Sequence, residues 1–558
     1  MNLTGIGVSP GLARGRVVEV RHDAVAVPTS EPPETDREEA IHAVVAALED
    51  VARSMERRAE HVRDHDAREV LHATAMIARD PAIGTEVSRQ LDAGQGRLRA
   101  LATAVDHFAV LLTDVGGYMA ERVADLRDVH RRAHARLLGV AEPGMPELTS
   151  PGVIVAQDLS PADTAEFDPA TVLGVVTEQG GPTSHTAILA SQLGIPAVVG
   201  CEGVMAAGAT TIALDGTTGE VVVDPGAETT SAWERRESQR DRLRARNGGP
   251  GHTKDGRPVE LLANLGTLHD ALTAGGADVE GSGLFRSEFL YLGRQEAPTV
   301  EEQTETYARV FEAMGRRKVV VRTLDAGADK PLSFATMGPE ANPALGLRGL
   351  RLYEALPDLV AGQLQAIAEA ARASEAEVWV MAPMISTPLE AGWFHDLAHD
   401  AGVERVGTMV EVPAAALRAH QVLERCDFAS VGTNDLAQYL FAADRMEGRL
   451  MELLDAWQPG LWQLTKVTTD AGRALGKPVG MCGEACGDPL LALLAVGAGI
   501  ASLSMALPKV PLVRASLARH TVAQCEEMLD AVLAADCPAT ARQAVRQMIH
   551  PDVRDFLL

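Results

Sequence analysis

The N-terminal part of the chain carries a helical pattern of hydrophobic positions. From about residue 28 to residue 140, apolar residues recur at three- and four-residue steps, the spacing of one face of an α-helix. The first such run consists of Ile41, Val44, Val45, Leu48, Val51, Met55 and Val62. Breaks near Pro81 and Gly94–Gly96 divide the segment, and Pro-rich joints (PTSEPPETDREE and AEPGMPELTSPG) bound it. The pattern predicts about four helices, which form a bundle inserted in another domain.

On either side of this segment the pattern changes to short β-branched runs. Residues 141–226 contain GVIVA, TVLGVVTE, PAVVG, TTIALD and EVVVD, with a helix-like SHTAILASQLG between the second and third. Residues 1–27 read as short strands with turns and are expected to complete the same compact α/β domain. A charged, helix-prone stretch follows and ends in GGPG, so residues 227–250 are predicted to form a linker helix with a hinge.

The remaining residues, 251–558, alternate strand-like and amphipathic helical stretches. The strand-like segments are 259–265, 281–289, 318–325, 378–385, 405–412, 428–436, 478–485 and 500–506. Such alternation is typical of parallel sheets, and eight units indicate a (β/α)8 TIM barrel with its active site at the carboxyl ends of the strands. Polar residues cluster at those ends: Arg286, Arg322, Glu411, Asn434, Asp435 and Cys482. Salt bridges that close the barrel rim would be the structural explanation; six polar ends favour a functional site.

Composition narrows the class of protein. The 558 residues include 51 Lys plus Arg and 77 Asp plus Glu, a formal net charge of −26, which argues against a nucleic-acid binder. Six dispersed cysteines give no zinc or disulfide framework, and the N-terminus has no signal-peptide pattern, so a cytoplasmic protein is expected. The uncharged run from Pro489 to Pro508 is split by Gly497 and Gly499, which favours a buried helix and a strand over a membrane span.

His185 is the first candidate for chemistry. In the segment TEQGGPTSHTAILASQLG, a strand ends at Glu178, a Gly-Gly-Pro turn follows, and Ser184-His185-Thr186 open a helix. Unpaired amide N–H groups and the helix dipole favour an anion at that position. A neutral imidazole there can accept a phosphoryl group. A capping or core histidine remains the structural alternative.

The barrel offers a second set of reactive groups. Cations suited to phosphate and carboxylate lie near the predicted strand ends or in the loops that follow them: Arg286, Arg322, Lys330, Arg348 and Arg445. Glu411 and Asp435 end consecutive strands and offer oxygen ligands for Mg²⁺. Cys482 ends the seventh strand and is either a buried filler or an acid–base group. Together these residues predict a pocket for a small, highly anionic phospho-carboxylate.

Seven segments of the chain carry a resemblance to a known family. GGPTSHTAI, GLFRSEFLY, VRTLDAGADKP, NPALGLRGLR, MVEVPAA, GTNDLAQY and GMCGE are similar to the signature segments of Enzyme I, the phosphoenolpyruvate–protein phosphotransferases of the bacterial sugar phosphotransferase system. The resemblance covers essentially the whole chain. Pyruvate phosphate dikinase and phosphoenolpyruvate synthase share single motifs, but they also need an ATP-binding module, for which 558 residues leave no room.

The resemblance implies a function for each domain. It implies a swivelling phosphohistidine α/β domain (1–27 and 141–226), an inserted helical domain that docks the phosphocarrier HPr (28–140), a linker helix (227–250) and a phosphoenolpyruvate-binding barrel (251–558) that also forms a homodimer. His185 would accept the phosphoryl group, Thr164 would orient its imidazole, and Cys482 would protonate the enolpyruvate to give pyruvate. The substrate-binding residues implied are Arg286, Arg322, Lys330, Arg348, Asn434 and Arg445.

The resemblance also implies that Mg²⁺ binds at Glu411 and Asp435. The chain departs from the family's usual pattern at Pro182, Ser287 and Ala328 and after Arg445 in DRMEG (residues 444–448), and none of these changes removes a reacting group. These departures bear on rate and affinity more than on the type of reaction.

Two other functions would account for part of the pattern. A magnesium-dependent barrel lyase or aldolase acting on pyruvate-like substrates would explain Glu411 and Asp435 but would leave the His185 domain and the helical insert without a role. A non-enzymatic regulatory scaffold that binds a carrier through its helices would be expected to have lost a reacting residue, and none is lost.

Overall fold

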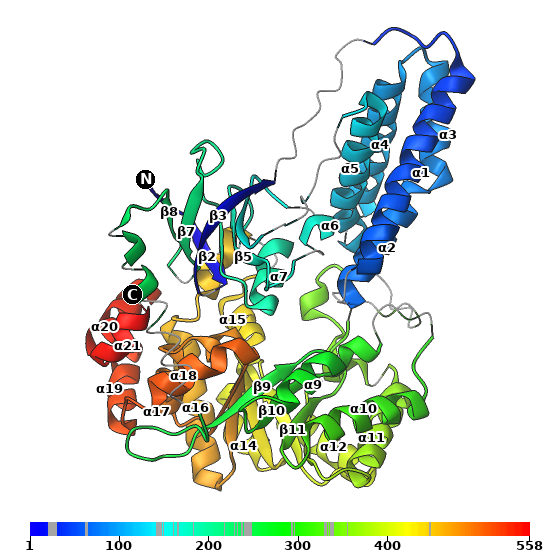
Figure 1. Ribbon diagram of the computed structural model, residues 1–558. Helices are drawn as coiled ribbons and strands as arrows, with labels where there is room; N and C mark the ends of the chain where they lie inside the picture. The colour runs from blue at the N-terminus through cyan, green and yellow to red at the C-terminus, as the bar shows by residue number, and fades with distance from the viewer. Residues whose placement is uncertain are drawn as a thin grey trace. The chain divides into compact units, whose positions relative to one another are not determined.

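A computed structural model of the chain divides into two compact units, Met1–Glu234 and Arg235–Leu558 (Figure 1). It describes the chain apart from residues 10, 21–30, 62–64, 116, 141–144, 146–147, 149, 160, 165–166, 182–183, 217, 228, 232, 236–237, 239–247, 292–293, 295, 328–331, 333, 335–339, 354, 446–447 and 558. Most of the expected linker helix, together with Lys330, Pro182 and Ala328, therefore lies outside the described residues.

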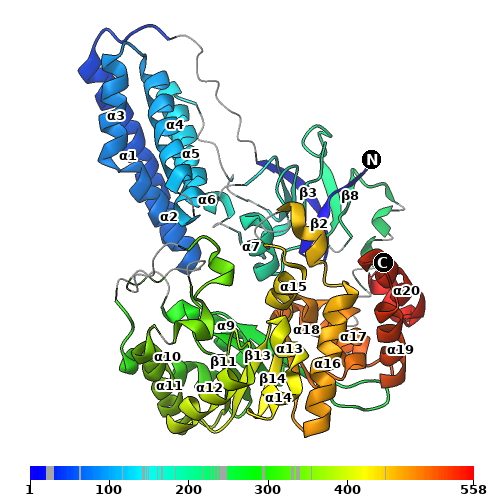
Figure 2. The same ribbon diagram turned by 180° about the vertical axis from the view of Figure 1, so that it is seen from behind.

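The first unit contains the predicted helical insert. Its helices are α1 (Arg37–His61), α2 (His65–Ala78), α3 (Pro81–Asp92), α4 (Arg97–Val115) and α5 (Gly117–Leu138), which run side by side as an elongated bundle (Figures 1 and 2). Asp80 caps α3, because its Oδ1 accepts a hydrogen bond from Ala82 N at 2.9 Å, and Pro81 stands at the first helical position, where its missing N–H costs nothing. Five helical segments are described rather than about four. Residues 62–64, between α1 and α2, and residue 116, between α4 and α5, lie outside the described residues.

The predicted α/β domain is confirmed, with the first residues of the chain completing its sheet. The strands are β1 (Asn2–Thr4), β2 (Ile6–Ser9), β3 (Leu12–Val20), β4 (Gly152–Ala156), β5 (Val172–Thr177), β6 (Ala197–Val199), β7 (Thr211–Asp215) and β8 (Glu220–Val223). They form one sheet in the order β1-β8-β7-β3-β4-β5-β6-β2. The central strands β3 to β6 are parallel, so their carboxyl ends meet at one edge, where α6 (Pro161–Thr164) follows β4 and α7 (His185–Leu193) follows β5.

The second unit is the predicted barrel. Its eight parallel strands close in the order β10-β11-β12-β13-β14-β15-β16-β9. They are β9 (Glu260–Leu265), β10 (Gly281–Arg286), β11 (Lys318–Arg322), β12 (Glu377–Ala382), β13 (Val406–Val410), β14 (Phe428–Gly432), β15 (Val479–Cys482) and β16 (Ser502–Met505).

Helices surround this barrel and extend beyond it. They are α9 (Leu268–Gly275), α10 (Val300–Met314), α11 (Pro357–Arg372), α12 (Pro388–Asp400), α13 (Pro413–Leu417), α14 (Ala419–Leu423), α15 (Thr433–Phe441), α16 (Pro459–Leu475), α17 (Leu491–Ala498), α18 (Val510–Leu517), α19 (Val522–Leu533), α20 (Pro538–Met548) and α21 (Pro551–Leu557). Short 3-10 segments lie at η1 (Ser287–Leu290), η2 (Pro343–Leu345), η3 (Gly349–Leu352), η4 (Gly448–Leu454), η5 (Glu484–Gly487) and η6 (Leu507–Lys509).

Most of the predicted barrel strands extend past the observed strand ends, and some of them run into a helical turn. The segment 281–289 leaves the barrel after Arg286 and continues as η1, and the segment 428–436 leaves it after Gly432 and continues as α15. Asp435 therefore stands in the first turn of a helix, not at the end of a strand. In both segments apolar residues continue past the last ladder hydrogen bond, because the helical turn that follows packs against the same core.

The interior of the barrel is filled by side chains. Leu284, Val320, Met381, Met409, Phe428 and Cys482 form a separate apolar cluster inside it. The uncharged segment near residue 490 forms α17, whose residues are all buried, followed by β16, as predicted. Within the described part of the chain, no helix is both long and apolar enough to cross a membrane.

The six cysteines differ sharply in exposure. Five are buried and only Cys537, at the N-cap of α20, is exposed. Hydrogen bonding to Thr540 holds the pKa of the Cys537 thiol below its usual value.

Candidate active site

The first candidate residue, His185, opens helix α7 directly after the turn that follows β5. Ser184 lies just before it, and the Ser184 Oγ accepts a hydrogen bond from Ala187 N at 3.3 Å, so Ser184 satisfies one of the free N–H groups of the helix end. Gly180 makes the turn possible with φ of +95°. The sequence thus placed His185 correctly on the backbone, while its side chain lies outside the described part of the structure.

Thr164, the residue expected to orient His185, ends helix α6 and is fully buried. Helix α6 packs against α7. The neighbouring Asp163 is also buried and accepts a hydrogen bond from Arg132 of helix α5, with 3.2 Å between Nη2 and Oδ1. Arg132 also donates from Nε to Asp128 Oδ2 at 2.6 Å. A buried ion pair therefore connects the helical bundle to the segment that carries Thr164.

The second group of candidates lies at the carboxyl ends of the barrel strands. Arg322, the last residue of β11, contacts Glu288 of η1 and Asp325, whose Oδ2 lies 3.1 Å from its Nη1. Burial acts to lower the pKa of Arg322, but the carboxylates of Glu288 and Asp325 outweigh it and raise that pKa. Both carboxylates are themselves buried.

Arg348 continues this row of alternating charges. Its Nη2 lies 2.9 Å from Asp325 Oδ2, and its Nη1 lies 3.1 Å from Asp435 Oδ1. Arg445 reaches the other oxygen of Asp435, with 3.8 Å between Nη1 and Oδ2. The structure thus brings together Arg322, Arg348, Arg445 and Asp435, which stand far apart in the sequence.

Glu411, directly after β13, is buried beside this row. Its Oε1 accepts a hydrogen bond from Met384 N at 2.7 Å. Burial raises the pKa of the Glu411 carboxyl group, and the nearby carboxylates of Asp435 and Asp325 raise it further. Burial and the neighbouring carboxylates destabilise the ionised form of Glu411, and a bound cation would stabilise it. The site therefore has the electrostatics that a divalent metal would satisfy.

The donors at this site suit Mg²⁺. Glu411 and Asp435 supply hard carboxylate oxygens, and among the described residues no group of three or more His, Cys, Asp and Glu side chains is arranged to hold a metal. Mg²⁺ commonly binds one or two carboxylates and completes its shell with water and substrate oxygens. The two carboxylates at the mouth of the barrel match this mode of coordination.

Cys482 ends strand β15 and caps the apolar cluster inside the barrel. It is 2% exposed, its Sγ accepts a hydrogen bond from Ser430 Oγ at 3.4 Å, and the thiol can donate to Val431 O at 3.7 Å. Burial raises the pKa of the Cys482 thiol above its usual value. The thiol is therefore protonated at neutral pH, the state that a proton donor requires.

The remaining candidates lie around the same mouth. Arg286 ends β10 with an exposed side chain and has no recorded ion pair among the described residues. Asn434 stands in the first turn of α15, and its Oδ1 accepts a hydrogen bond from Glu484 N at 3.4 Å. Lys330 lies outside the described residues.

Three residues of this site have no role predicted from the sequence. Glu288 and Asp325 hold the arginines in place, and Ser287 donates from Oγ to Arg322 O at 2.8 Å. All three follow strand ends within the motifs GLFRSEFLY and VRTLDAGADKP. Charged residues next to a strand-end arginine in an apolar segment were the available signal.

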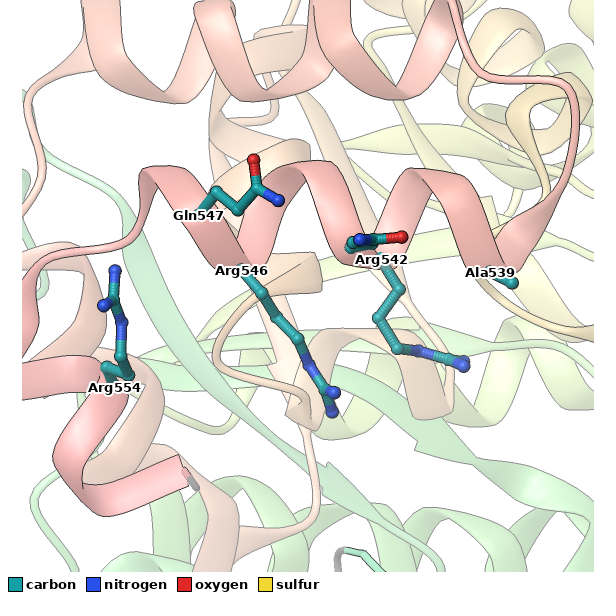
Figure 3. A pocket seen from close by; sticks show the side chains of 6 residues that line it. Ala539, Arg542, Arg546, Gln547 and Arg554 are labelled. Carbon is teal, nitrogen blue, oxygen red and sulfur yellow. The ribbon is translucent and has the colours of Figure 1, made fainter.

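A separate concave surface lies along helices α20 and α21. This cavity of about 730 Å³ is lined by Ala539, Arg542, Gln543, Arg546, Gln547 and Arg554. Arg542 and Arg546 extend from the same side of α20 (Figure 3). The cavity lining contains no carboxylate, thiol or imidazole, so the cavity lacks the groups that the strand-end site brings together.

Three family models match the chain. The model described as the PEP-binding domain of PEP-utilising enzymes matches residues 240–522, the mobile domain of these enzymes matches residues 148–219, and their N-terminal domain matches residues 4–122. The first match contains the barrel site, and the second contains Thr164 and His185.

Curated relatives align with almost the entire chain. A phosphoenolpyruvate-protein phosphotransferase of Streptomyces coelicolor is 47% identical over 556 residues, which cover 98% of this chain and 99% of the relative. One of Haloferax volcanii is 38% identical over 559 residues, covering 96% and 97%. Among solved structures, an NMR solution structure of an Enzyme I protein is 30% identical, with a TM-score of 0.40, covering 43% of this chain and 99% of that chain.

Proposed function

Because the chain belongs to the phosphoenolpyruvate–protein phosphotransferases, a family of enzymes, we propose that it transfers the phosphoryl group of phosphoenolpyruvate to His185 and then to the phosphocarrier HPr. The observation that carries this proposal is the row of alternating charges at the strand ends, buried apart from the partly exposed Arg445. It presents Arg322, Arg348 and Arg445 near Glu411 and Asp435. A trianionic phospho-carboxylate is the class of substrate that such a pocket favours.

Binding and charge neutralisation come from the arginines. Arg322 and Arg348, joined by Arg286, Arg445, Lys330 and Asn434, hold the phosphate and carboxylate of the substrate. Guanidinium groups match both anions by paired hydrogen bonds. Because phosphoryl transfer depends mainly on positioning and on stabilising charge, cations fixed by buried carboxylates suit the reaction.

In the transfer step, the bond between phosphorus and the enol oxygen breaks while a bond forms to an imidazole nitrogen of His185. The leaving group is the enolate of pyruvate. Thr164 orients the imidazole for this attack. Glu411 and Asp435 would hold Mg²⁺, which supplies further neutralisation of the phosphate charge when bound.

Cys482 completes the reaction by donating its proton to C3 of the enolate, which gives pyruvate. Its protonated state follows from its burial, and the strand end places it at the mouth of the barrel. A new proton from solvent then restores the thiol.

His185 and the arginines belong to different units of the chain. The proposed transfer therefore needs the two units to meet during the reaction, and we assign residues 227–250 as the hinge. The helical domain, residues 28–140, docks HPr, and the barrel domain, residues 251–558, forms a homodimer. The protein acts in the cytoplasm without membrane insertion.

The test uses phosphoenolpyruvate labelled at phosphorus, with Mg²⁺ and the full-length protein. An acid-labile, base-stable label is expected on the protein and is expected to vanish in His185→Ala. His269→Ala, which changes an exposed histidine of α9, serves as the control and should keep the label. Label that persists in His185→Ala would disprove the assignment. Formation of a pyruvate-derived product without any labelled protein would favour the lyase alternative.

A further inference from the structure

Met384 has an unusual backbone conformation beside the strand-end site. It lies two residues after strand β12, and its φ is +62°, one of three positive values at non-glycine residues in the described part of the chain. Its side chain is only 1% exposed. Residues with a Cβ rarely adopt this region, so the surroundings must hold Met384 there.

In this turn the Met384 N–H faces Glu411. The N–H donates to Oε1 at 2.7 Å, and it is the one hydrogen bond recorded for this carboxylate among the described residues. On the other side of Glu411 lies Gly432, where an added Cβ would stand 3.0 Å from Oε2 and 3.1 Å from the Glu411 Cβ. The carboxylate therefore sits between a backbone donor and a glycine, with Oε2 left for another partner.

The space for Met384 comes from a second glycine. At Gly349, whose φ is +55°, an added Cβ would lie 2.9 Å from Met384 Cγ and 3.1 Å from its Cβ. Leu350 N also donates to Pro383 O at 3.4 Å. Gly349 directly follows Arg348, so the loop that carries this arginine and the turn that holds Glu411 pack against each other.

We propose that Met384 is a positioning residue for Glu411. Its left-handed backbone keeps the N–H on Oε1 and so presents Oε2 to the divalent cation, while its contact with Gly349 couples this orientation to the loop of Arg348. The inference rests on the metal role that the proposed function gives to Glu411. Partners that orient a metal ligand commonly matter almost as much for metal affinity as the ligand itself.

The test measures Mn²⁺ binding by electron paramagnetic resonance in the His185→Ala background, so that phosphoenolpyruvate stays bound without reacting. Met384→Val places a β-branched residue where positive φ is strongly disfavoured, which should move the N–H and raise the Kd for Mn²⁺ roughly tenfold. Met384→Gly tolerates this φ and keeps the N–H, so its Kd should stay within about threefold of the parent.

Met528→Val changes a buried methionine on α19 and serves as the matched control, with no expected change in Kd. Glu411→Gln should weaken Mn²⁺ binding by itself. Thermal unfolding shows that each variant is folded. If Met384→Val does not fold, Gly349→Ala takes its place, because its Cβ would displace Met384, and an unchanged Kd there would overturn the proposal.

The outcomes distinguish a failure of the role of Met384 from a failure of the metal assignment of Glu411. Weaker binding in Glu411→Gln together with normal binding in Met384→Val would overturn the role of Met384 alone. Equal weakening in Met384→Gly and Met384→Val would also overturn it, because side-chain bulk and not backbone conformation would then be responsible. Normal binding in Glu411→Gln would remove the metal assignment of the proposed function, and the role of Met384 with it.

Discussion

In the strand-end site, the carboxylate of Asp325 allows two buried arginines to lie close to each other. Arg322 and Arg348 would repel each other in a buried site, and Asp325 lies between them with one oxygen, Oδ2, within 3.1 Å of the first and 2.9 Å of the second. Asp325 is 1% exposed, so water screens this interaction little. It holds both guanidinium groups in place before the substrate arrives.

Replacing Asp325 by Asn keeps the shape of the side chain and removes its charge. We expect the free energy of unfolding to fall by about 3 kcal/mol, because a buried pair would lose one partner. The KM for phosphoenolpyruvate should rise, since Arg322 and Arg348 lose the carboxylate that holds both guanidinium groups in place. Chemical denaturation and steady-state kinetics measure the two effects. Glu375→Gln, which removes the carboxylate of an exposed pair with Arg316, is the control, and an equal loss of stability in both variants would contradict the prediction.

Cys482 is the second residue with a distinct expected outcome. In Cys482→Ser the donor becomes a hydroxyl, whose pKa lies far above that of a thiol, so protonation of the enolate should slow while phosphorylation of His185 still occurs. Labelling of the protein and release of pyruvate, measured in parallel, separate the steps. Unchanged turnover would show that Cys482 fills the barrel mouth without acting as an acid.

For single residues, the sequence predicted which residues belong to the site better than it predicted which residues contact one another. Arg322 could be recognised because a charged residue at the end of an apolar strand is costly without a function, whereas Arg348 was predicted only as a cation in a loop that follows a strand. Glu288 and Asp325 could not be assigned, because a local pattern does not reveal which residues of other loops face an arginine. Met384 gave no signal at all, since its role depends on a backbone angle and on two distant glycines.

At the scale of elements, the ion pair between α5 and α6 connects two parts of the first unit. Arg132, Asp128 and Asp163 are each no more than 2% exposed, so water screens the attraction between these charges little. Helix α6 has a single turn, and it ends in Thr164. Its position therefore depends on the contact with α5.

Arg132→Met keeps much of the side-chain volume and removes the charge. We expect it to lower the free energy of unfolding of the first unit by about 3 kcal/mol and to slow labelling of His185. Denaturation and rapid-quench labelling test both. Arg131→Met removes a pair with the same Asp128 from a side chain that is 33% exposed, so its effect should be smaller. Equal effects in the two variants would contradict a specific role for the contact with Asp163.

Hydrophobic patterns predicted the elements of the barrel but not their ends. All eight strands were predicted, but most were drawn too long. The segments 281–289 and 428–436 run into helical turns, because Phe289 and Leu436 continue the apolar run after the chain has turned into a helix. Gly483 marks such an end more clearly. Its φ is +125° and an added Cβ would lie 2.2 Å from Thr433 Oγ1, so only glycine fits directly after Cys482.

At the scale of the whole molecule, the two units have separate cores. The apolar clusters of the helical bundle and of the sheet lie within Met1–Glu234, and those of the barrel lie within Arg235–Leu558. This division agrees with the predicted order of an interrupted α/β domain followed by a barrel. The sequence could predict it because the period of the hydrophobic pattern changes at each boundary, whereas the arrangement of the units leaves no such local pattern.

Separate cores predict two unfolding transitions. Calorimetry of the full-length protein should resolve them, and phosphoenolpyruvate with Mg²⁺ should raise only the transition of the barrel unit. At a hundredfold excess over Kd the added stability is about 2.7 kcal/mol. Sulfate at matched ionic strength is the control. One transition that shifts as a whole would show that the units unfold together.

The difference in exposure among the cysteines allows opening of the barrel to be measured by thiol modification. Cys537 is the single exposed thiol, whereas Cys482 is closed off by the barrel. An alkylating reagent should therefore modify Cys537 at once without loss of activity, and then inactivate the enzyme only as fast as the barrel mouth opens to admit it. The rate of the slow phase of inactivation would then report the rate of that opening. Substrates that close the barrel mouth should lower this rate.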